Sequence, residues 1–370
     1  MTIQERAMRS GRRDLLRLGA GLGAAAALPG GAQAQDFSGR TVEWVIPFAV
    51  AGGSDVWARF HQPFLQRHLA GQPTVVIRNI AGGGGINGSN QFAARARPDG
   101  MMFFGTSGST QFPFLLGDSR VRYDYGDWSP IMASPTGGVL YIRPEVGVAG
   151  PQDIAKLRAA TGLKFGSQGP SSLDMVPALA FELLGMDVQI VMGMPGRGAG
   201  RMSFERGETP IDYQTSSAYI SQVQPLVRQG HAVPLCSWGL LNEAGEIVRD
   251  PSFPDLPHFA EFLEAATGTK PSGPAWNAWK TLFVAGFAAQ KFVVMPKATP
   301  AAIQEAYRAA FRRTLADPEY LEKRGPVIGT YDEVVGEACT RAYAAATVID
   351  AETREWCRDW LKRRFNHSVG

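Results

Sequence analysis

The chain of 370 residues is 45% hydrophobic and 19% charged, a composition that supports buried cores and excludes intrinsic disorder. Its length fits about two domains, at roughly 100–200 residues each. The formal charge of +3 belongs to the first 34 residues, since the rest has 32 basic and 32 acidic residues; this balance excludes the basic patch that nucleic acid or an acidic membrane surface requires.

The first 34 residues have the features of an export signal. Arg12 and Arg13 form a twin-arginine pair, and a run of Ala, Gly and Leu at 18–28 follows them. This run is shorter than the ~18–20 apolar residues that span a membrane. An A-x-A cleavage site stands at 32–34, so we expect residues 1–34 to be a twin-arginine-type signal peptide, removed on export to the periplasm.

Short apolar strands alternate with glycine-rich turns and helices in the first part of the mature chain. The pattern predicts strands at 42–48, 74–78 and 101–105 and helices at 56–69 and 89–96. Glycine-rich turns at 51–55 and 79–88 join the first two strands to the helices that follow them. This order is typical of a parallel α/β sheet.

The rest of the chain continues this alternation and contains no internal repeat. We expect helices at 151–160, 174–184 and 218–229 and strands at 163–166, 187–192 and 232–236. The last third begins with a proline-rich stretch and an apolar run at 282–288, and ends in helical patterns at 300–316 and 331–364.

The two glycine-rich turns favour an anion-binding site. Each follows a strand and opens a helix, whose N-terminus offers unpaired N–H groups and about half a positive charge. Ligands of open α/β sheets bind beyond the carboxyl ends of the strands. A third loop at 105–110, Gly-Thr-Ser-Gly-Ser-Thr, follows the next strand. Together these features favour the interpretation that the glycines form a ligand site, rather than only tight turns. Such a site binds an anion without Lys or Arg.

Motifs of catalysis and of cofactor binding are incomplete in this sequence. Residues 83–88 satisfy G-x-G-x-x-G, but no acidic residue follows about 20 positions later, so we do not expect a dinucleotide. No G-x-S-x-G elbow and no P-loop Lys occurs. His61 and His68 could share a helix face, but no carboxylate completes a metal set, and solvated or capping roles are expected. We therefore expect no enzyme, no cofactor and no metal.

The three cysteines form no disulfide framework and no zinc motif. We expect Cys236, Cys339 and Cys357 to be single buried thiols. The alternative is a bond between Cys339 and Cys357, if two C-terminal helices face each other.

Several segments resemble the tripartite tricarboxylate transporter receptors, also called Bug-type periplasmic binding proteins. The family patterns I-V-P-F-P-A-G-G-G-T-D and N-R-P-G-A-G-G-N-I-G correspond to residues 45–55 and 79–88. A-x-P-D-G-Y-T-L, G-T-S-G, P-D-V-P, A-G-T-P and L-A-D-P-E correspond, in order, to residues 96–103, 105–108, 253–257, 297–300 and 315–319. The resemblance therefore covers nearly the whole mature chain.

The middle and the end of the chain depart from the family pattern. Asp174 stands where the family has a His, and the sequence at 194–197 replaces a Y-K-G segment. These positions belong to the part that defines the far end of the ligand in the family, so the type of ligand is left open. The basic C-terminus at 362–364 is expected to be a solvated helix end, with docking to a partner as the alternative.

The resemblance implies an α/β, two-lobed periplasmic binding protein of the type II-like kind. Each lobe would be a mostly parallel sheet flanked by helices, and a hinge would close the lobes around the ligand. Lobe 1 would take residues 36–140 and 246–370, and lobe 2 would take residues 141–245.

On this basis we expect a carboxylate site built mainly from backbone groups, with water as a possible bridge. N–H groups of the two turns would hold the carboxylate, Phe48 would line the pocket, and Arg197 would pair a second carboxylate. The full set of expected ligand-binding residues is Phe48, Gly52, Gly53, Ser54, Gly83, Gly84, Gly85, Ser107, Ser109, Ser171, Ser172, Arg197 and Gln214. Helix capping is the alternative role of Ser171 and Ser172.

The function that the resemblance implies is capture of a small organic carboxylate for a membrane permease. The expected partners are this ligand and the permease subunits of the transporter, the protein is expected to be a monomer, and nucleic acid is excluded. Two alternatives are left open by the sequence. One is a binding module for a membrane sensor kinase, and the other is an exported enzyme.

Overall fold

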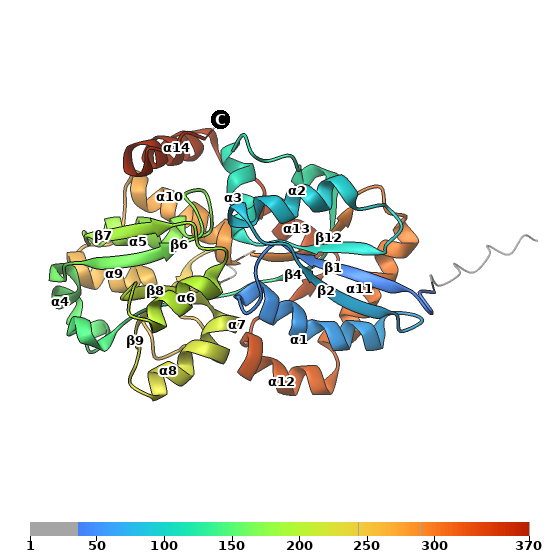
Figure 1. The fold of residues 1–370 in the computed structure, drawn as a ribbon, viewed down its shortest axis with the longest axis horizontal. Helices are drawn as coiled ribbons and strands as arrows, with labels where there is room; N and C mark the ends of the chain where they lie inside the picture. The colour runs from blue at the N-terminus through green and yellow to red at the C-terminus, as the bar shows by residue number, and fades with distance from the viewer. Residues whose placement is uncertain (1–35, 243, 289, 370) are drawn as a thin grey trace, which may run out of the picture. The chain divides into compact units, whose positions relative to one another are not determined.

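A six-stranded sheet with helices on both faces forms one part of the protein (Figure 1). This computed structural model describes residues 36–242, 244–288 and 290–369, so the expected leader at 1–34 lies outside the described residues. The strand order is β13-β4-β12-β3-β1-β2. The strands are β1 (Thr41–Ile46), β2 (Thr74–Asn79), β3 (Met102–Gly105), β4 (Trp128–Ser134), β12 (Lys291–Pro296) and β13 (Val334–Val335). β1 pairs in parallel with β2 and β3, while β12 is antiparallel to β3 and β4.

A second group of strands follows β4 in the chain. Its members are β5 (Gly138–Ile142), β6 (Leu163–Ser167), β7 (Val188–Met192), β8 (Ile211–Thr215) and β9 (Val233–Ser237). β5 lies between β8 and β9 and is antiparallel to both, and β6 pairs in parallel with β7. A small hairpin joins β10 (Leu240–Leu241) to β11 (Ile247–Val248).

Helices cover both faces of the first sheet. One face packs against α1 and α11, and the other against α2 and α13 (Figure 1). The helices of this part are α1 (Gly53–His68), α2 (Ile86–Arg95), α3 (Gly108–Leu116), α11 (Ala301–Leu315), α12 (Pro318–Ile328) and α13 (Glu337–Ala346). Strand β12 is apolar on both faces, because Val293 and Met295 belong to one core and Phe292 and Val294 to the other. Both faces of the sheet must therefore pack against helices.

The helices around the second group of strands come from two distant parts of the chain. They are α4 (Ile154–Ala159), α5 (Met175–Leu183), α6 (Arg197–Glu205), α7 (Ser216–Ala218), α8 (Gln224–Arg228), α9 (Phe259–Thr267), α10 (Pro274–Phe283) and α14 (Ala351–Phe365). Leu179 of α5, Trp279 of α10 and Trp360 of α14 lie in one buried core with Phe165 of β6. The last third of the chain therefore packs on both groups of strands.

The expected alternation of strands and helices is confirmed, and the boundaries differ by a few residues. The helical pattern at 331–364 is interrupted, since α13 ends at Ala346 and α14 begins at Ala351. The sequence pattern missed several elements, among them the strands β4, β5, β8 and β12 and the helices α3, α6, α9, α10 and α12. In β8 the apolar Ile211 and Tyr213 alternate with Asp212 and Gln214, the pattern of a half-buried strand, yet all of them are buried.

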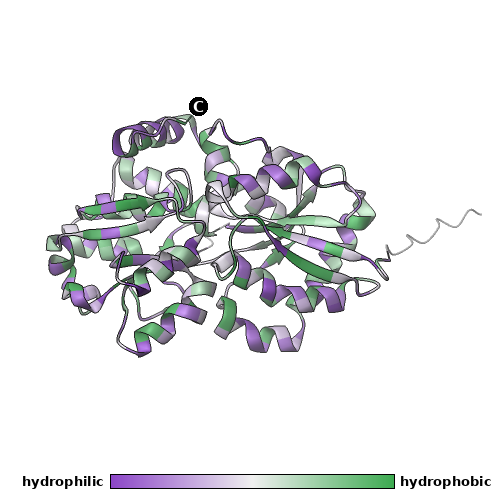
Figure 2. Cartoon of the chain, viewed as in Figure 1, coloured by the Kyte–Doolittle hydropathy of each residue, from purple (hydrophilic) through white to green (hydrophobic). Residues whose placement is uncertain are grey.

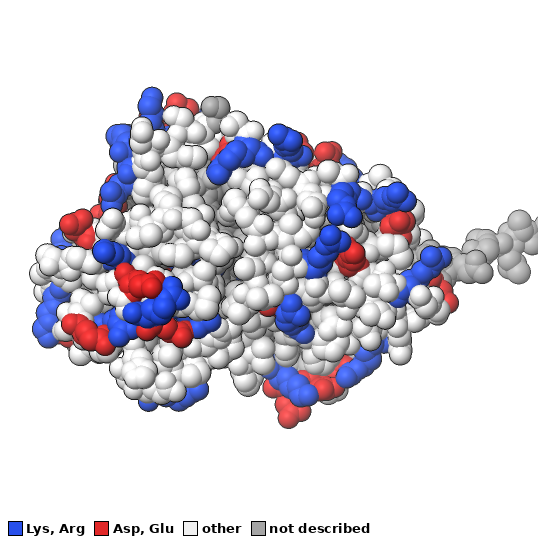
Figure 3. Space-filling view, viewed as in Figure 1, with Lys and Arg blue, Asp and Glu red and all other residues white. Residues whose placement is uncertain are grey.

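The three cysteines are free and buried, so the single-thiol expectation is confirmed and a Cys339–Cys357 bond is not formed. Apolar residues concentrate in the strands and on the inner faces of the helices (Figure 2). On the face in view, Lys and Arg alternate with Asp and Glu, and few charged side chains lie over the middle (Figure 3). In the described part of the chain, no helix combines the length and the apolar character that crossing a bilayer requires.

Candidate functional site

A narrow cavity of about 20 Å³, enough for about one water molecule, lies where the two groups of strands meet. Its first wall belongs to the six-stranded sheet and its helices, and consists of Phe48, Gly52, Gly53, Ser54, Ser107, Ser109 and Gln290. Its second wall belongs to the other group of strands, and consists of Gln168, Leu173, Arg197 and Thr215. Seven of the thirteen expected ligand-binding residues thus line one cavity: Phe48, Gly52, Gly53, Ser54, Ser107, Ser109 and Arg197.

The N-terminus of α1 forms the centre of the first wall. Gly52 is its N-cap residue, and no side chain caps the helix, so the first N–H groups have no partner within the helix. Asp55 holds the turn in place, because its carboxylate accepts hydrogen bonds from the Ala51 N–H at 2.9 Å and from Asn79 Nδ2 at 3.0 Å. Arg59 pairs with Asp55 at 2.9 Å and offsets its negative charge.

A second helix N-terminus meets α1 from the other side of the cavity. α6 also begins without a side-chain cap, after Gly196. The two helix starts are close, since a Cβ placed on Gly198 would lie 3.2 Å from the Ala51 carbonyl oxygen and one on Gly52 would lie 3.9 Å from the Gly198 nitrogen. Two uncapped helix starts at one cavity favour an anion there.

The walls are joined by close contacts that leave no space for larger side chains. Ser217 Oγ donates to the Gly53 carbonyl oxygen at 2.9 Å, and the Leu173 N–H donates to Ser109 Oγ at 2.9 Å. A Cβ on Gly53 would lie 1.8 Å from Thr215 Oγ1, which no real structure allows. Gly53 is therefore the residue that lets the first wall approach the second.

Arg197 is buried in the second wall and is already paired with two carboxylates. Its guanidinium donates to Asp212 and lies 3.5 Å from Asp174, and it also donates to the Gly166 carbonyl oxygen of β6 at 2.5 Å and to the Tyr213 carbonyl oxygen of β8 at 3.0 Å. Burial opposes its charge, but the two carboxylates outweigh burial and raise the pKa of Arg197 above its ordinary value. Only Nε of the guanidinium has no partner among the described residues, so only Nε is available for the expected bond to a second carboxylate of the ligand.

Asp174, the position where the related pattern has a His, holds this wall together. Its carboxylate accepts hydrogen bonds from the Gln168 N–H at 2.6 Å, Ser167 Oγ at 3.1 Å and Tyr213 Oη at 3.0 Å. Asp212, the other partner of Arg197, accepts from Tyr141 Oη at 2.5 Å, and burial raises its pKa. Asp174, which stands where the related pattern has a His, is therefore paired with Arg197 of the same wall.

The second glycine-rich turn lies beside the cavity rather than in its lining. Gly83, Gly84 and Gly85 all have positive φ, at 59°, 67° and 106°, which only glycine adopts readily. A Cβ on Gly85 would lie 2.9 Å from the Phe48 ring, and one on Gly84 would lie 3.5 Å from Cβ of Ser172. This turn supports Phe48 and meets the second group of strands.

Ser171, Ser172 and Gln214 also lie outside the cavity lining. The two hydroxyls and Gln214 Nε2 make internal bonds, while Gln214 Oε1 has no partner in the described part of the chain. Ser171 Oγ donates to Asp118 at 2.9 Å, and Ser172 Oγ donates to the Gly169 carbonyl oxygen at 2.7 Å and accepts from the Asp174 N–H at 3.3 Å. The alternative role of the two serines, helix capping, is not seen at α5, which begins without a side-chain cap. Gln214 is fully buried and donates to the Arg197 carbonyl oxygen at 2.8 Å.

Four cavity residues were missed by sequence reasoning: Gln168, Leu173, Thr215 and Gln290. Gln168 Nε2 and Thr215 Oγ1 are buried polar atoms without a partner in the described part of the chain. Such atoms cost free energy unless a ligand or water satisfies them, so they point to a ligand site. The start of α6 could have been predicted from the sequence, because the glycine-flanked segment Gly196-Arg197-Gly198 opens it. No sequence pattern marked Thr215 or Gln290.

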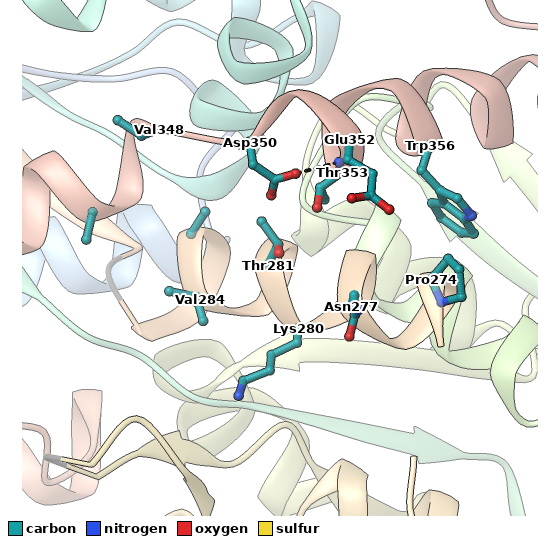
Figure 4. Close-up of a pocket in the computed structure, with 12 residues that line it drawn as sticks. Pro274, Asn277, Lys280, Thr281, Val284, Val348, Asp350, Glu352, Thr353 and Trp356 are labelled. Atoms are coloured by element: carbon teal, nitrogen blue, oxygen red, sulfur yellow. Dashed lines mark hydrogen bonds between the residues drawn. The ribbon is translucent and has the colours of Figure 1, made fainter. Parts of the chain in front are cut away.

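A larger hollow of about 500 Å³ lies between α10 and the segment that leads into α14 (Figure 4). Asp350 in its lining is used as a cap, since its carboxylate accepts from the Thr353 N–H at 2.7 Å. Among the described residues that line this hollow, none carries a buried polar atom without a partner. Size alone therefore does not make it the better candidate.

His61 is fully buried, so the expectation of a solvated or capping role is wrong for this residue. Its ring lies 3.0 Å from the Glu333 carboxylate and 3.0 Å from Tyr320 Oη. His68 is partly exposed and bonds to Asp317 at 2.8 Å. Across the described ranges, no group of three or more His, Cys, Asp and Glu side chains has a geometry that could hold a metal ion.

No protein-family model matches this sequence, and no curated protein is significantly similar to it. Solved structures are similar in fold. Rpa4515 of R. palustris with adipate has a TM-score of 0.66 at 19% identity, over 89% of this chain and 98% of that chain. The periplasmic binding protein BugD has a TM-score of 0.64 at 19% identity, over 88% of this chain and 97% of that chain. MatC (Rpa3494) of Rhodopseudomonas palustris with bound malate has a TM-score of 0.62 at 20% identity, over 88% of this chain and 98% of that chain. The resemblance drawn from the glycine-rich turns is confirmed at the level of the fold, and the chain has the α/β fold of these periplasmic binding proteins.

Proposed function

We propose that this protein is a periplasmic solute receptor that binds a small carboxylate and catalyses no reaction. The observation that carries the proposal is the convergence of two uncapped helix N-termini, of α1 and α6, on one cavity. The fold shared with BugD, and with proteins bound to adipate and malate, supports it.

We also propose that the cavity lies between two lobes that separate to admit the ligand. The proposed division is 36–140 plus 246–370 and 141–245. The six-stranded sheet, which draws all its strands from the first two ranges, supports it, but the boundary at 140 falls inside β5, which pairs with β8 and β9. Packing of α9, α10 and α14 on the second group of strands adds a further link between the lobes. A transporter of the tripartite tricarboxylate type is the proposed destination of the ligand, and residues 1–34 are the proposed export signal.

The proposal is tested by thermal unfolding of the mature chain in the presence of organic acids. A panel of acetate, benzoate, malate, adipate and citrate covers one to three carboxyl groups. A ligand that binds only the folded state stabilises it by about 2.7 kcal/mol at 100 times its Kd, so at least one acid is expected to raise Tm in a saturable way. If the whole panel, with the matching primary amides as controls, leaves Tm unchanged, the proposal is wrong.

A further inference from the structure

We propose that Gln290 is a specificity-determining donor for the ligand carboxylate and that the buried Lys291 positions it. This inference rests on the proposed function, and it names the side chains that recognise the anion. Gln290 lines the first wall of the cavity, and both residues are almost fully buried.

The orientation of the Gln290 amide follows from the chemistry of its neighbour. Lys291 Nζ contacts Gln290 Oε1. In its protonated form, which a bound carboxylate favours, Lys291 has three N–H donors and no acceptor, so it binds the oxygen of the amide and not the nitrogen. The Nε2 group of Gln290 must therefore point away from Lys291. Within the described ranges the side-chain hydrogen bond of Gln290 is made by Oε1, and because Gln290 lines the cavity, Nε2 is the donor that it can present there.

The backbone fixes both residues at the ligand end of the sheet. Lys291 is the first residue of β12, where it pairs with Ser134 of β4. On the other side, the Thr106 N–H donates to the Phe292 carbonyl oxygen at 2.9 Å and Thr106 Oγ1 donates to the Gln290 carbonyl oxygen at 3.4 Å. The start of β12 is therefore held next to the loop that carries Ser107 and Ser109.

The face on which Lys291 lies brings its charge to the α1 side of the sheet. Val293 and Met295 belong to the core shared with α1, and strand alternation puts Lys291 on that same face. The α1 N-terminus, which carries partial positive charge, opens the same wall. The α1 start and the Gln290 amide thus line the cavity, and Lys291 bonds to that amide from outside the lining. This combination favours an anionic acceptor over a neutral one.

Few groups compensate the charge of Lys291, which is why an anion would stabilise it. Among the described residues, Gln290 Oε1 is the hydrogen-bond partner of Nζ, and Glu333 is the charged group that acts on it. Glu333 itself is bonded to His61 and Tyr320. Burial lowers the pKa of Lys291 to about 7, in spite of the opposing effect of Glu333. A bound carboxylate would supply the missing countercharge.

The experiment is isothermal titration of wild type and four variants with the acid of the panel that wild type binds most tightly. Gln290→Glu is isosteric and still accepts from Lys291, but it presents an acceptor instead of a donor to the cavity. We expect it to weaken carboxylate binding about 100-fold, and Gln290→Ala and Lys291→Met to weaken it about 10-fold. Lys297→Met, an exposed lysine beyond the far end of β12, is the matched control and should bind as wild type does.

The outcomes separate this inference from the proposed function. Suppose that wild type binds the acid and that Gln290→Glu or Gln290→Ala, shown to be folded by circular dichroism and Tm, binds it with a Kd within threefold of wild type. This result would overturn the role of Gln290 but not the proposed function. Absence of binding by wild type to every acid would remove the proposed function and this inference with it. A positioning role of Lys291 further requires that the Lys291→Met and Gln290→Ala effects are not additive in the double variant, and additivity would contradict it.

Discussion

The two walls of the cavity meet a ligand by different means. The first wall offers backbone N–H groups of the α1 start and the amide of Gln290, and its nearby cation, Lys291, has no ion pair within the described residues. The second wall contains a cation of greater strength, Arg197, but Asp174 and Asp212 already pair with it. The comparison shows that a charged residue in the wall of a cavity does not attract the ligand when its charge is already paired within the protein. Net attraction for an anion comes from the wall with fewer charged side chains.

The largest effect is expected when the internal pairing of the second wall is broken. Arg197→Met leaves two buried carboxylates without their cation, which typically costs about 3–5 kcal/mol of folding free energy. Urea unfolding at pH 7 measures this loss. Arg206→Met, which removes an exposed arginine paired with the exposed Glu208, is the control and should leave the midpoint unchanged. A small effect of Arg197→Met on stability, with a large effect on carboxylate affinity, would instead make Arg197 a ligand residue.

The approach of the walls depends on Gly53, and its replacement is expected to abolish closure. In Gly53→Ala the new Cβ would collide with Thr215 Oγ1, so the walls cannot reach their present distance. We expect carboxylate affinity to fall about 100-fold, or roughly 2.7 kcal/mol, with little change in the stability of the ligand-free protein. Gly52→Ala is the neighbouring control, because its Cβ would meet no atom nearer than 3.8 Å and its φ of −87° suits alanine. Equal affinities of the two variants would refute this role of Gly53.

A pH dependence is expected from the first wall, through Lys291. Its pKa is about 7 in the folded protein against an ordinary value of 10.5, so between these pH values the unfolded chain binds a proton that the folded chain does not. Stability of the ligand-free protein should therefore rise with pH in this range relative to Lys291→Met, by at most about 1.4 kcal/mol per pH unit. Carboxylate affinity should change in the opposite direction, since the ammonium is lost. Urea unfolding and titration at pH 6.5 and 8.5 measure both, and parallel changes in the two quantities would contradict the assignment.

The smallest effect is expected at Ser171. Its hydroxyl bonds to Asp118 at 2.9 Å and accepts from Arg120 at 3.1 Å, and it does not line the cavity. Ser171→Ala should cost about 1 kcal/mol of stability and leave carboxylate affinity within twofold. Ser109→Ala is the informative comparison, since Ser109 accepts from the Leu173 N–H across the cavity and its loss should weaken binding. If Ser171→Ala were the more damaging of the two for affinity, the assignment of the lining would be incorrect.

The fold and the first wall were largely predictable from local sequence. Strands that end in glycine-rich turns and open helices fix the start of α1 and the position of Phe48, because these depend on residues near in the chain. The second wall was not predictable in the same way. Gln168, Arg197 and Thr215 come from distant segments, and β8 has only five residues, two of them apolar.

The sequence by itself determined the α/β class, the glycine turns and the neutral balance of charge in residues 35–370. Only the tertiary structure decided that α6, rather than α2, supplies the second helix N-terminus at the cavity, and that Arg197 is paired within its own wall. The physical reason is that a turn is encoded by the conformational freedom of its own residues. The charge that a ligand meets is instead the sum over side chains that folding brings together. Here Asp174 and Asp212 pair with Arg197, while Lys291 has no ion pair within the described residues.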